Sequence, residues 1–410
     1  MILIVSDIHL ADTAERETVD LESLCATIRA EAARARDKKY PFKVLLLGDI
    51  FEILKSQVWH ERDVRPWDSC SAKHIEAVTE IFEKIIANNA DFFSVLKALP
   101  ETAGDGEVVY VPGNHDWPLN GNMGAPARKR LIDVAGLRHR GGRPFPYVFT
   151  DVDHSLWASH GHEHDSANKT DPKTISLGDA IVIEVLLVLP ELVAKSLGCK
   201  SSDPQLKFLH ELDNVRPQSV GAMVSWLLLG AQELKHPDAS TAIARAIRTV
   251  VGKLNELRKR GNASDAWEQG DKWVGGLVAA ADFLLKKKDL LPMLAKLGGG
   301  GEESYASFGF LDLSRSFSKG NKPRFRHVAH GHTHLPEHTG LALDWASDVK
   351  PSVYLNTGTW RRVHRFGRRR DKNKSPYFAE FKEETCVVLY RKGECDMNSP
   401  SYEFRRIVRG

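Results

Sequence analysis

Histidine, aspartate and asparagine recur along this chain in five short motifs, each directly after an apolar run typical of a β-strand. The motifs are Asp7-Ile8-His9, Gly48-Asp49-Ile50-Phe51-Glu52, Gly113-Asn114-His115-Asp116, His160-Gly161-His162 and Gly331-His332-Thr333-His334. The runs before them are MILIVS, FKVLLL, EVVYV, SLWAS and FRHVA. Because every motif follows a strand, we expect carboxylates, imidazoles and one amide to gather from five strand ends near one open surface.

The donor atoms of these motifs suit divalent transition metals. Neutral imidazole and carboxylate oxygen favour borderline first-row ions, with Mn as the first choice and Fe, Zn or Co as alternatives. No Cys lies near a motif, which argues against a closed structural zinc site. The predicted ligands are Asp7, His9, Asp49, Asn114, His160, His332 and His334. They are too many for one ion, but with one bridging carboxylate they suffice for two ions that keep positions open to water and substrate.

Two such ions favour one kind of reaction. Ions about 3.5–4 Å apart clamp the attacking and leaving oxygens of a phosphoryl displacement and lower the pKa of a bound water. The sequence therefore predicts metal-assisted hydrolysis of a phosphomonoester, phosphodiester or pyrophosphate bond. The predicted substrate is a phosphorylated small molecule or nucleotide.

The ordered motifs resemble the calcineurin-like metallophosphoesterase superfamily, whose pattern runs DxH, GDxxD, GNHD/E, H and GHxH. The resemblance covers roughly residues 1–165 and 325–360 and is nearest, through GDIFE and GHTHLP, to the UDP-2,3-diacylglucosamine pyrophosphatase-like branch. It implies a first ion held by Asp7, His9, Asp49 and His334, and a second held by Asp49, Asn114, His160 and His332. Asp49 would bridge the two.

The same resemblance implies a catalytic group beside the ions. His115 is expected to donate a proton or a hydrogen bond to the phosphoryl or leaving oxygen, which departs more easily when protonated. A carboxylate usually orients such a ring, and Glu52 stands where the superfamily pattern has Asp. Asp116 completes the predicted catalytic set of His115, Glu52 and Asp116.

Three further residues are predicted to contact substrate. Arg361 and Arg362 begin the basic run 361–374, and Arg makes bidentate contacts with phosphate oxygens. A solvated basic loop is the alternative interpretation of this run. His162 is included because it stands on the His160 loop. The preceding segment NTGTW, residues 356–360, is interpreted as a scaffold that closes a sheet, with Gly358 allowing close backbone approach.

Strand and helix patterns alternate up to about residue 165, which predicts an α/β fold. By the resemblance, residues 1–165 and 325–410 form a two-sheet α/β/β/α sandwich, with helices expected over 18–38 and 71–99. Residues 175–297 have a helical pattern almost throughout. We therefore predict that 166–324 is a large inserted helical cap domain close to the metals, with a passive packing or dimerisation module as the alternative.

Composition indicates an ordinary globular protein. The 410 residues are 42% hydrophobic and carry a net charge of +3, so no general affinity for polyanions follows. Five scattered Cys without CxxC spacing fit a reducing compartment. The first strand begins at residue 2, and the apolar stretch 180–194 is shorter than the ~20 residues of a membrane span. We expect a cytoplasmic protein with no transmembrane segment; its oligomeric state is not predicted.

Other functions compete with hydrolysis of a small phosphorylated metabolite. A nuclease or nucleotide phosphodiesterase that used the basic run 361–374 would employ the same ligands and bind nucleic acid. A protein Ser/Thr phosphatase is disfavoured, because the chain lacks the motifs GDxVDRG and GNHE. A catalytically silent binding scaffold is disfavoured too, because every expected ligand is present.

Overall fold

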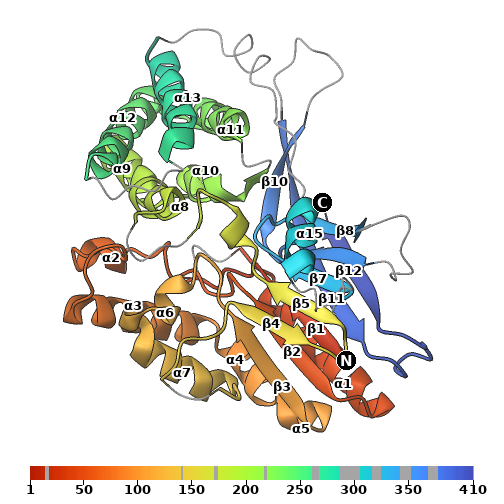
Figure 1. Ribbon diagram of the computed structural model, residues 1–410. Helices are drawn as coiled ribbons and strands as arrows, with labels where there is room; N and C mark the ends of the chain where they lie inside the picture. Colours follow the sequence, from red (N-terminus) through yellow and green to blue (C-terminus); the bar gives the residue numbers. More distant parts are fainter. Residues whose placement is uncertain are drawn as a thin grey trace.

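The computed structural model of the chain contains two mixed β-sheets surrounded by many helices (Figure 1). The structure describes residues 1–13, 18–139, 142–169, 174–216, 219–260, 267–286, 305–315, 325–341, 352–367 and 377–409. The α/β class predicted from the alternation of strands and helices is confirmed.

The larger sheet has seven strands in the order β3-β2-β1-β11-β10-β6, with β12 paired to β11. Strands β1, β2 and β3 are parallel, whereas β11 runs antiparallel to β1, β10 and β12. The strands are β1 (Ile2–Val5), β2 (Phe42–Leu47), β3 (Gly106–Val111), β6 (Val215–Arg216), β10 (Arg362–Gly367), β11 (Tyr377–Tyr390) and β12 (Ser401–Arg409).

The smaller sheet has five strands in the order β4-β5-β7-β9-β8. Its three central strands are parallel, and the two outer strands are antiparallel to their neighbours. The strands are β4 (Val148–Asp151), β5 (Leu156–Ser159), β7 (His327–His330), β8 (Pro336–Leu341) and β9 (Ser352–Thr357). Since β5 and β7 are parallel neighbours, the two histidine motifs that follow them leave the sheet at the same edge.

The two sheets face each other across an apolar core. Side chains alternate between the two faces of a strand, so Ile2 and Ile4 of β1 pack with Leu156 and Leu355 of the smaller sheet. The residues between them face the helices on the other side of the larger sheet, as Leu3 does. The fully apolar sequence of β1 follows from its burial on both faces.

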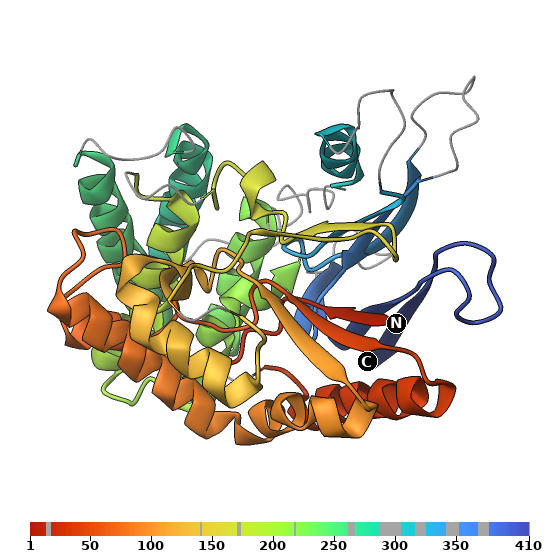
Figure 2. The same cartoon turned by 60° about the horizontal axis from the view of Figure 1, so that its bottom comes forward.

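Helices from the first third of the chain cover the outer face of the larger sheet (Figure 2). The helix predicted over 18–38 is α1 (Leu21–Lys38). The helix predicted over 71–99 is instead three: α3 (Ala72–Asn88), α4 (Ala90–Lys97) and α5 (Leu99–Ala103). The first break is at Asn89, whose backbone leaves the helical conformation with φ −125° and ψ 34°. Its side-chain amide also donates to the Ile85 carbonyl at 2.9 Å. The shorter elements nearby are α2 (Val58–Glu61), α6 (Trp117–Asn120), η2 (Asn122–Gly124) and α7 (Ala125–Ala135).

The segment between the His160 and His332 loops is mostly helical, and most of its helices form a group beside the sheets (Figure 1). They are η3 (His162–His164), α8 (Leu177–Ile181), the π-helical turn η4 (Val182–Leu186), α9 (Val188–Leu197), η5 (Pro204–Leu206), α10 (Lys207–His210), η6 (Leu212–Asn214), α11 (Val220–Glu233), α12 (Ala239–Arg258), α13 (Trp267–Lys286) and α15 (Ala306–Arg315). The segment is not purely helical, because its strand β6 pairs with β10 in the larger sheet. The part of the predicted helical segment after residue 286 lies outside the described residues.

Buried polar contacts tie this group of helices to the rest of the chain. Arg65 donates to Glu184 of η4 at 2.5 Å. The His60 Nε2 donates to the neighbouring Ile183 carbonyl at 2.9 Å. Lys55, three residues beyond Glu52, forms an ion pair with Asp213 of η6 at 2.9 Å. The helices are therefore held against the loop that follows β2.

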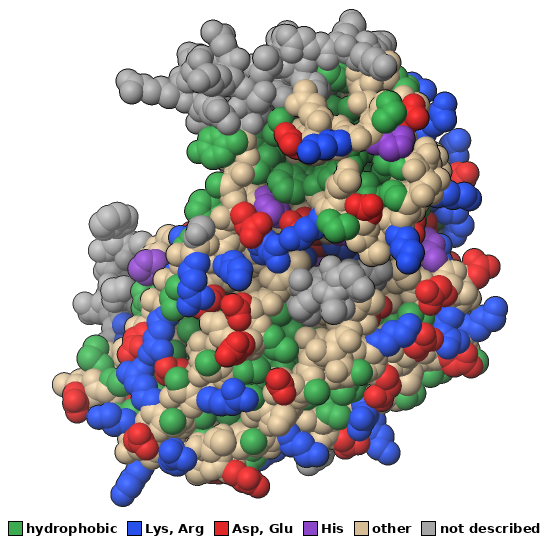
Figure 3. All heavy atoms as spheres, turned by 180° about the vertical axis from the view of Figure 1, so that it is seen from behind, with side chains coloured by type: hydrophobic (Ala, Val, Ile, Leu, Met, Phe, Trp, Pro, Cys, Tyr) green, Lys and Arg blue, Asp and Glu red, His purple; other side chains and the backbone are tan. Residues whose placement is uncertain are grey.

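The surface carries charges of both signs. On the face shown in Figure 3, blue Lys and Arg side chains are interspersed with red Asp and Glu side chains. Several form ion pairs, such as Arg62 with Glu80 at 2.7 Å and Arg130 with Glu83 at 3.0 Å. Among the described residues, no helix has both the length and the hydropathy that crossing a membrane requires.

Candidate metal centre

The five motif loops meet at one end of the two sheets. The loop after β1 is bonded to the loop after β2, with the Asp7 amide donating to Gly48 O at 3.1 Å and the His9 amide donating to Asp49 O at 2.9 Å. The loops after β5 and β7 are joined by the Gly331 amide, which donates to His160 O at 3.0 Å. These backbone contacts bring the four motifs together in two pairs.

Glycine is required where the third motif approaches the second. A Cβ placed on Gly113 would lie 2.5 Å from Asp49 N, a separation that no side chain tolerates. The Asp49 Oδ1 accepts a hydrogen bond from the amide of His115 at 2.8 Å. The glycine therefore lets Asp49 lie against the GNHD loop.

Five predicted ligands adopt a left-handed backbone conformation, which is uncommon for residues other than glycine. Asp7, His9, Asp49, His332 and His334 have φ between 50° and 68°. Such conformations cost of order 1–3 kcal/mol each and persist where the surrounding structure enforces them, often at functional sites. Their concentration in these loops indicates that the side-chain directions are constrained.

Two groups of donor atoms are formed. In the first, His334 Nε2 lies 3.2 Å from Asp7 Oδ1 and 3.2 Å from His9 Nε2. In the second, His160 Nε2 lies 3.3 Å from Asp49 Oδ2. The His332 Nδ1 of the second group lies 3.0 Å from the amide oxygen of Asn114. All seven predicted ligands are brought together.

Asp49 stands between the groups. Its Oδ2 is 3.3 Å from His160 Nε2 and 3.7 Å from His9 Nε2. Each group contains three donors within 4.8 Å of one another, Asp7 with His9 and His334, and Asp49 with His160 and His332. The buried His and Asp side chains can therefore hold metal ions.

The outer nitrogens of three ligand rings have acceptor partners. His160 Nδ1 lies 2.9 Å from Leu47 O, His9 Nδ1 lies 2.8 Å from Glu52 Oε2, and His332 Nε2 lies 3.0 Å from Asp165 Oδ2. An acceptor holds the ring proton on the outer nitrogen and leaves the inner lone pair for a metal. The His160 Nε2 is buried and makes no hydrogen bond of good geometry among the described residues, as this arrangement requires.

The fourth ring, His334, has a cationic partner instead. Arg216 of β6 lies 2.5 Å from His334 Nδ1. A guanidinium only donates, so Nδ1 accepts, and the proton of the neutral ring stands on Nε2, the atom nearest Asp7. Burial and then the Arg216 charge lower the pKa of His334 well below its usual range. An ion at Nε2 requires that lone pair, so Arg216 opposes binding at the first group.

Electrostatics at the second group favour a cation. Burial lowers the pKa of His160, but the charges of Asp49 and Asp7 outweigh it and raise that pKa to about 10. The two carboxylates thus create a strongly negative potential at His160 Nε2. The same potential would favour a divalent ion at this position.

The His115 ring is held by Glu52. The Glu52 side chain, one methylene longer than the Asp of the superfamily pattern, therefore reaches this ring. The His115 Nδ1 lies 2.7 Å from Glu52 Oε1, while the other carboxylate oxygen holds His9. Burial lowers the pKa of His115, but Glu52 and Asp49 outweigh it and raise the pKa to about 9. His115 is therefore held in its protonated form, and it lines the cleft described next.

A cleft of about 500 Å³ opens over the two groups. Its floor contains motif residues such as Asn114 and His332, together with Arg361. Its opposite wall comes from the inserted helices and is mainly apolar, with Leu177, Ile181, Val182, Leu186 and Met223. The helical segment therefore contributes apolar side chains to the same cleft that the motif residues line.

Arg361 reaches the cleft within a buried ion network. Asp213 accepts from Lys55 Nζ at 2.9 Å and from the Arg361 guanidinium at 2.9 Å. Burial raises the pKa of Asp213, but Lys55 and Arg361 outweigh it and hold that pKa well below its usual range. The charged Asp213 fixes Arg361 beside the donor groups.

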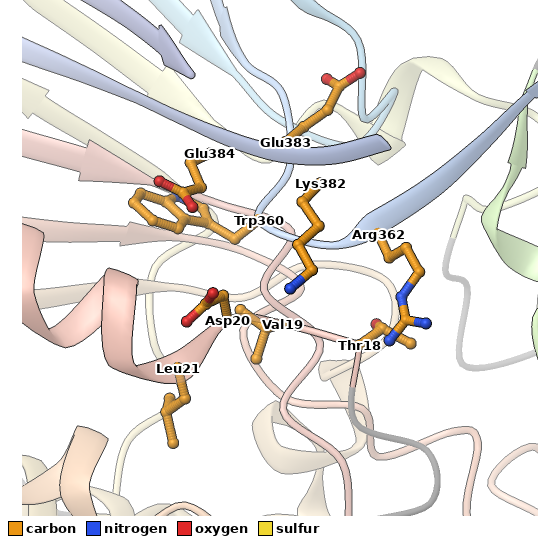
Figure 4. Close-up of a pocket in the computed structure, with 9 residues that line it drawn as sticks. All are labelled: Thr18, Val19, Asp20, Leu21, Trp360, Arg362, Lys382, Glu383 and Glu384. Carbon is orange, nitrogen blue, oxygen red and sulfur yellow. The ribbon is translucent and has the colours of Figure 1, made fainter. Parts of the chain in front are cut away.

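Six predicted site residues do not line the cleft. Asp7, Glu52 and His160 lie among the donor groups or hold their rings, and the other three are Asp116, Arg362 and His162. Asp116 is fully buried and accepts from the Gly113 amide at 2.5 Å and the Ile50 amide at 3.0 Å, so it positions two motif loops. Arg362 points into a separate cavity beside Lys382 (Figure 4) and lies 3.5 Å from Glu211. His162 is buried against the His160 ring, with centroids 5.5 Å apart.

Several residues that the motifs do not indicate also lie beside the donor groups. Arg216 and Asp213 come from the helical segment, where no motif marks them. Asp165 follows His160-Gly161-His162 on the same loop and contacts the His332 ring. Its acidic side chain close to the ligand histidines is the one feature of the sequence that indicates such a contact. The NTGTW segment is the scaffold that was predicted, because the Asn356 amide donates to Gly331 O at 2.7 Å and the Thr359 hydroxyl donates to Asp7 O at 2.8 Å.

Comparison with known proteins adds no family to this description. No protein-family profile matches the chain, and no curated protein shows significant similarity to it.

Proposed function

We propose that this chain is a dinuclear metal-dependent phosphoesterase of the calcineurin-like metallophosphoesterase type. Residues 1–165 and 325–410 would form its catalytic core, and 166–324 its helical cap. The observation that carries the proposal is the position of Asp49. One carboxylate oxygen lies 3.7 Å from His9 in one donor group and 3.3 Å from His160 in the other, as a bridging ligand requires.

The donor set fits two ions. The first would be held by Asp7, His9, Asp49 and His334, and the second by Asp49, Asn114, His160 and His332. Imidazole, carboxylate and amide donors without thiolate favour Mn²⁺ first, then Fe, Zn or Co. When bound, such ions polarise the phosphoryl group and supply hydroxide at neutral pH. The acceptors behind three of the four rings support this assignment.

His115 would act on the leaving group. Glu52 holds the Nδ1 side of its ring, so the opposite nitrogen is directed to the cleft that His115 lines. A protonated ring there donates its proton to the departing oxygen as the P–O bond breaks, and Glu52 stabilises the charged ring. The resulting neutral ring then takes a proton from solvent, which restores the starting state.

The substrate would lie between the donor groups and the apolar wall of the cleft. Arg361 is the cation placed to bind a phosphate oxygen, because it lines the cleft and is fixed by Asp213. The apolar wall would exclude bulk water and so strengthen each polar contact beside it. We therefore favour a phosphorylated small molecule or nucleotide as the substrate.

The structure gives the nuclease alternative no specific observation in its favour. Arg361 is buried in its ion network, and Arg362 faces a separate cavity. Arg365 is paired with Glu383 at 2.6 Å, and residues 368–374 of the basic run lie outside the described residues. A short single-stranded DNA belongs among the test substrates for this reason.

The proposal is tested by turnover. Chelator-treated protein is assayed with and without Mn²⁺ on bis(4-nitrophenyl) phosphate, 4-nitrophenyl phosphate, a nucleoside diphosphate sugar and single-stranded DNA. We expect Mn²⁺-dependent hydrolysis that is lost in Asp49→Asn and kept in Glu211→Gln, a matched change at a buried carboxylate outside the cleft. Absence of turnover on every substrate with Mn²⁺, Fe²⁺, Zn²⁺ and Co²⁺ would overturn it.

A further inference from the structure

A second group of histidine and aspartate side chains lies outside the candidate metal centre. His164 ends η3, Asp312 is on α15, and His330 ends β7. One donor atom from each residue lies within 4.8 Å of the other two. The group shares no residue with the seven predicted ligands, so it is a separate site.

The two imidazoles converge on one carboxylate oxygen. The Asp312 Oδ2 lies 2.9 Å from His164 Nε2 and 3.0 Å from His330 Nε2. The same 3.0 Å separates His332 and Asn114, which are predicted ligands of a single ion. Zinc–ligand bonds of roughly 2.0–2.2 Å place tetrahedral donors roughly 3.3–3.6 Å apart. Outward shifts of a few tenths of an ångström would therefore admit a zinc ion.

Packing fixes the rings in this orientation. The His164 ring stacks on Phe308, with centroids 4.8 Å apart and an interplanar angle of 11°. The His330 ring meets Tyr354 edge to face at 5.4 Å. Asp312 and His330 are buried, with 2% and 0% of their surface exposed. The donors are thus preorganised, and little side-chain freedom remains to be lost when an ion binds.

The three donors come from separate segments that surround the candidate metal centre. His164 lies on the loop that carries His160, and His330 directly precedes the loop that carries His332. Asp312 belongs to α15, which packs on the smaller sheet with Tyr354. A shared ion would therefore join this helix to both loops.

We propose that His164, Asp312 and His330 bind a third divalent cation, Zn²⁺ by preference, which fastens α15 to the two histidine loops. Two imidazoles and one carboxylate form a common three-residue ligand set for zinc, with water as the fourth ligand. An ion held by these three side chains would link the three segments that carry them. This inference does not depend on the hydrolytic function.

The test counts zinc ions per chain by mass spectrometry after chelator treatment and reconstitution of the full-length protein. Wild type should bind three ions, and His164→Gln and Asp312→Asn should each bind two. His154→Gln is the matched control, since His154 is also buried and bonded to a carboxylate, that of Asp151; it should bind as many ions as wild type. An unchanged zinc count in folded His164→Gln and Asp312→Asn would overturn the proposal.

The Asp49→Asn background isolates the third ion. This variant should keep one zinc ion, and adding His164→Gln should remove it. Because loss of an indirect partner alone weakens metal binding 10–100-fold, loss of a direct ligand should weaken it by at least about 10². Zinc should raise the melting temperature of Asp49→Asn and leave that of the double variant unchanged. If zinc changed the melting temperatures of Asp49→Asn and the double variant equally, the proposed zinc site would be contradicted. A wild-type protein that binds this zinc ion but hydrolyses no substrate would count only against the proposed function.

Discussion

Glu52 holds His115 and His9 with opposite oxygens of one carboxylate, 2.7 Å from His115 Nδ1 and 2.8 Å from His9 Nδ1. A ring predicted to donate a proton and a ring predicted to bind a metal therefore share one anchor. The two histidine rings also touch edge to face, with centroids 4.6 Å apart. Proton donation and metal binding should consequently respond together to changes at Glu52.

His115→Ala should keep the metal ions and slow hydrolysis by about 10²–10⁴-fold, the usual effect of losing a positioned acid. The loss should be smaller on 4-nitrophenyl esters, because nitrophenolate leaves without protonation. Steady-state kinetics on an alkyl and a nitrophenyl phosphate ester would measure this difference. Equal losses on both esters would argue for charge stabilisation in place of proton donation.

Glu52→Gln should weaken metal binding by about 10–100-fold, because the side chain orients a ligand ring without binding the ion. The neutral amide has one acceptor oxygen, so either His9 or His115 loses its partner. Calorimetric titration with Mn²⁺ gives the dissociation constant, and turnover should fall as well. A variant with normal Mn²⁺ affinity and normal turnover would show that the shared anchor is unimportant.

Arg216→Met should strengthen ion binding at the first donor group. The substitution keeps an unbranched side chain but removes the donor that holds the proton of His334 on Nε2. Arg362→Met is the control, since Arg362 is a cation outside the cleft lining. Mn²⁺ titrations of the two variants should differ, with a lower dissociation constant for Arg216→Met alone. The same constant in both would mean that Arg216 does not oppose the ion.

Asp213→Asn should destabilise the protein at neutral pH by roughly 3–5 kcal/mol, since it removes the buried carboxylate that pairs with both Lys55 and Arg361. The folded pKa of Asp213 lies below its unfolded value of about 3.9, so its stabilising effect is complete above that pH and lost as the pH falls further. Urea unfolding should show a constant difference from wild type between pH 7 and 5. That difference should shrink below about pH 4, and a pH-independent difference would contradict the ion network.

The donor groups were predictable because each ligand stands in a motif at a strand end, and parallel strands release their loops at one edge. Arg361 and Arg362 could not both reach the cleft, since neighbouring residues at the start of a strand face opposite sides; the prediction that Arg362 joins Arg361 there ignored this alternation. Asp116 has the residue type of a catalytic group, but backbone amides occupy both its oxygens.

The contacts that the helical segment makes with the donor groups could not be predicted from the motifs. Asp213 and Arg216 stand in ordinary sequence, and only the pairing of β6 with β10 places Arg216 near His334. At Asn89 the backbone leaves the helical conformation, a break that the apolar pattern of residues 71–99 does not record. The contacts of Asp213 and Arg216 thus depend on pairing between distant segments of the chain. The break at Asn89 is accompanied by one local polar bond.

The central claim is that Asp49 joins two metal ions, and the metal content of Asp49→Asn tests it most directly. Wild-type and variant protein, both reconstituted with Mn²⁺, are compared by inductively coupled plasma mass spectrometry, with folding checked by circular dichroism. Asp49→Asn should hold two ions fewer per chain than wild type, whereas Asp151→Asn, a matched change at a carboxylate that pairs with Lys43, should match wild type. A folded Asp49→Asn protein with the wild-type metal content would contradict it.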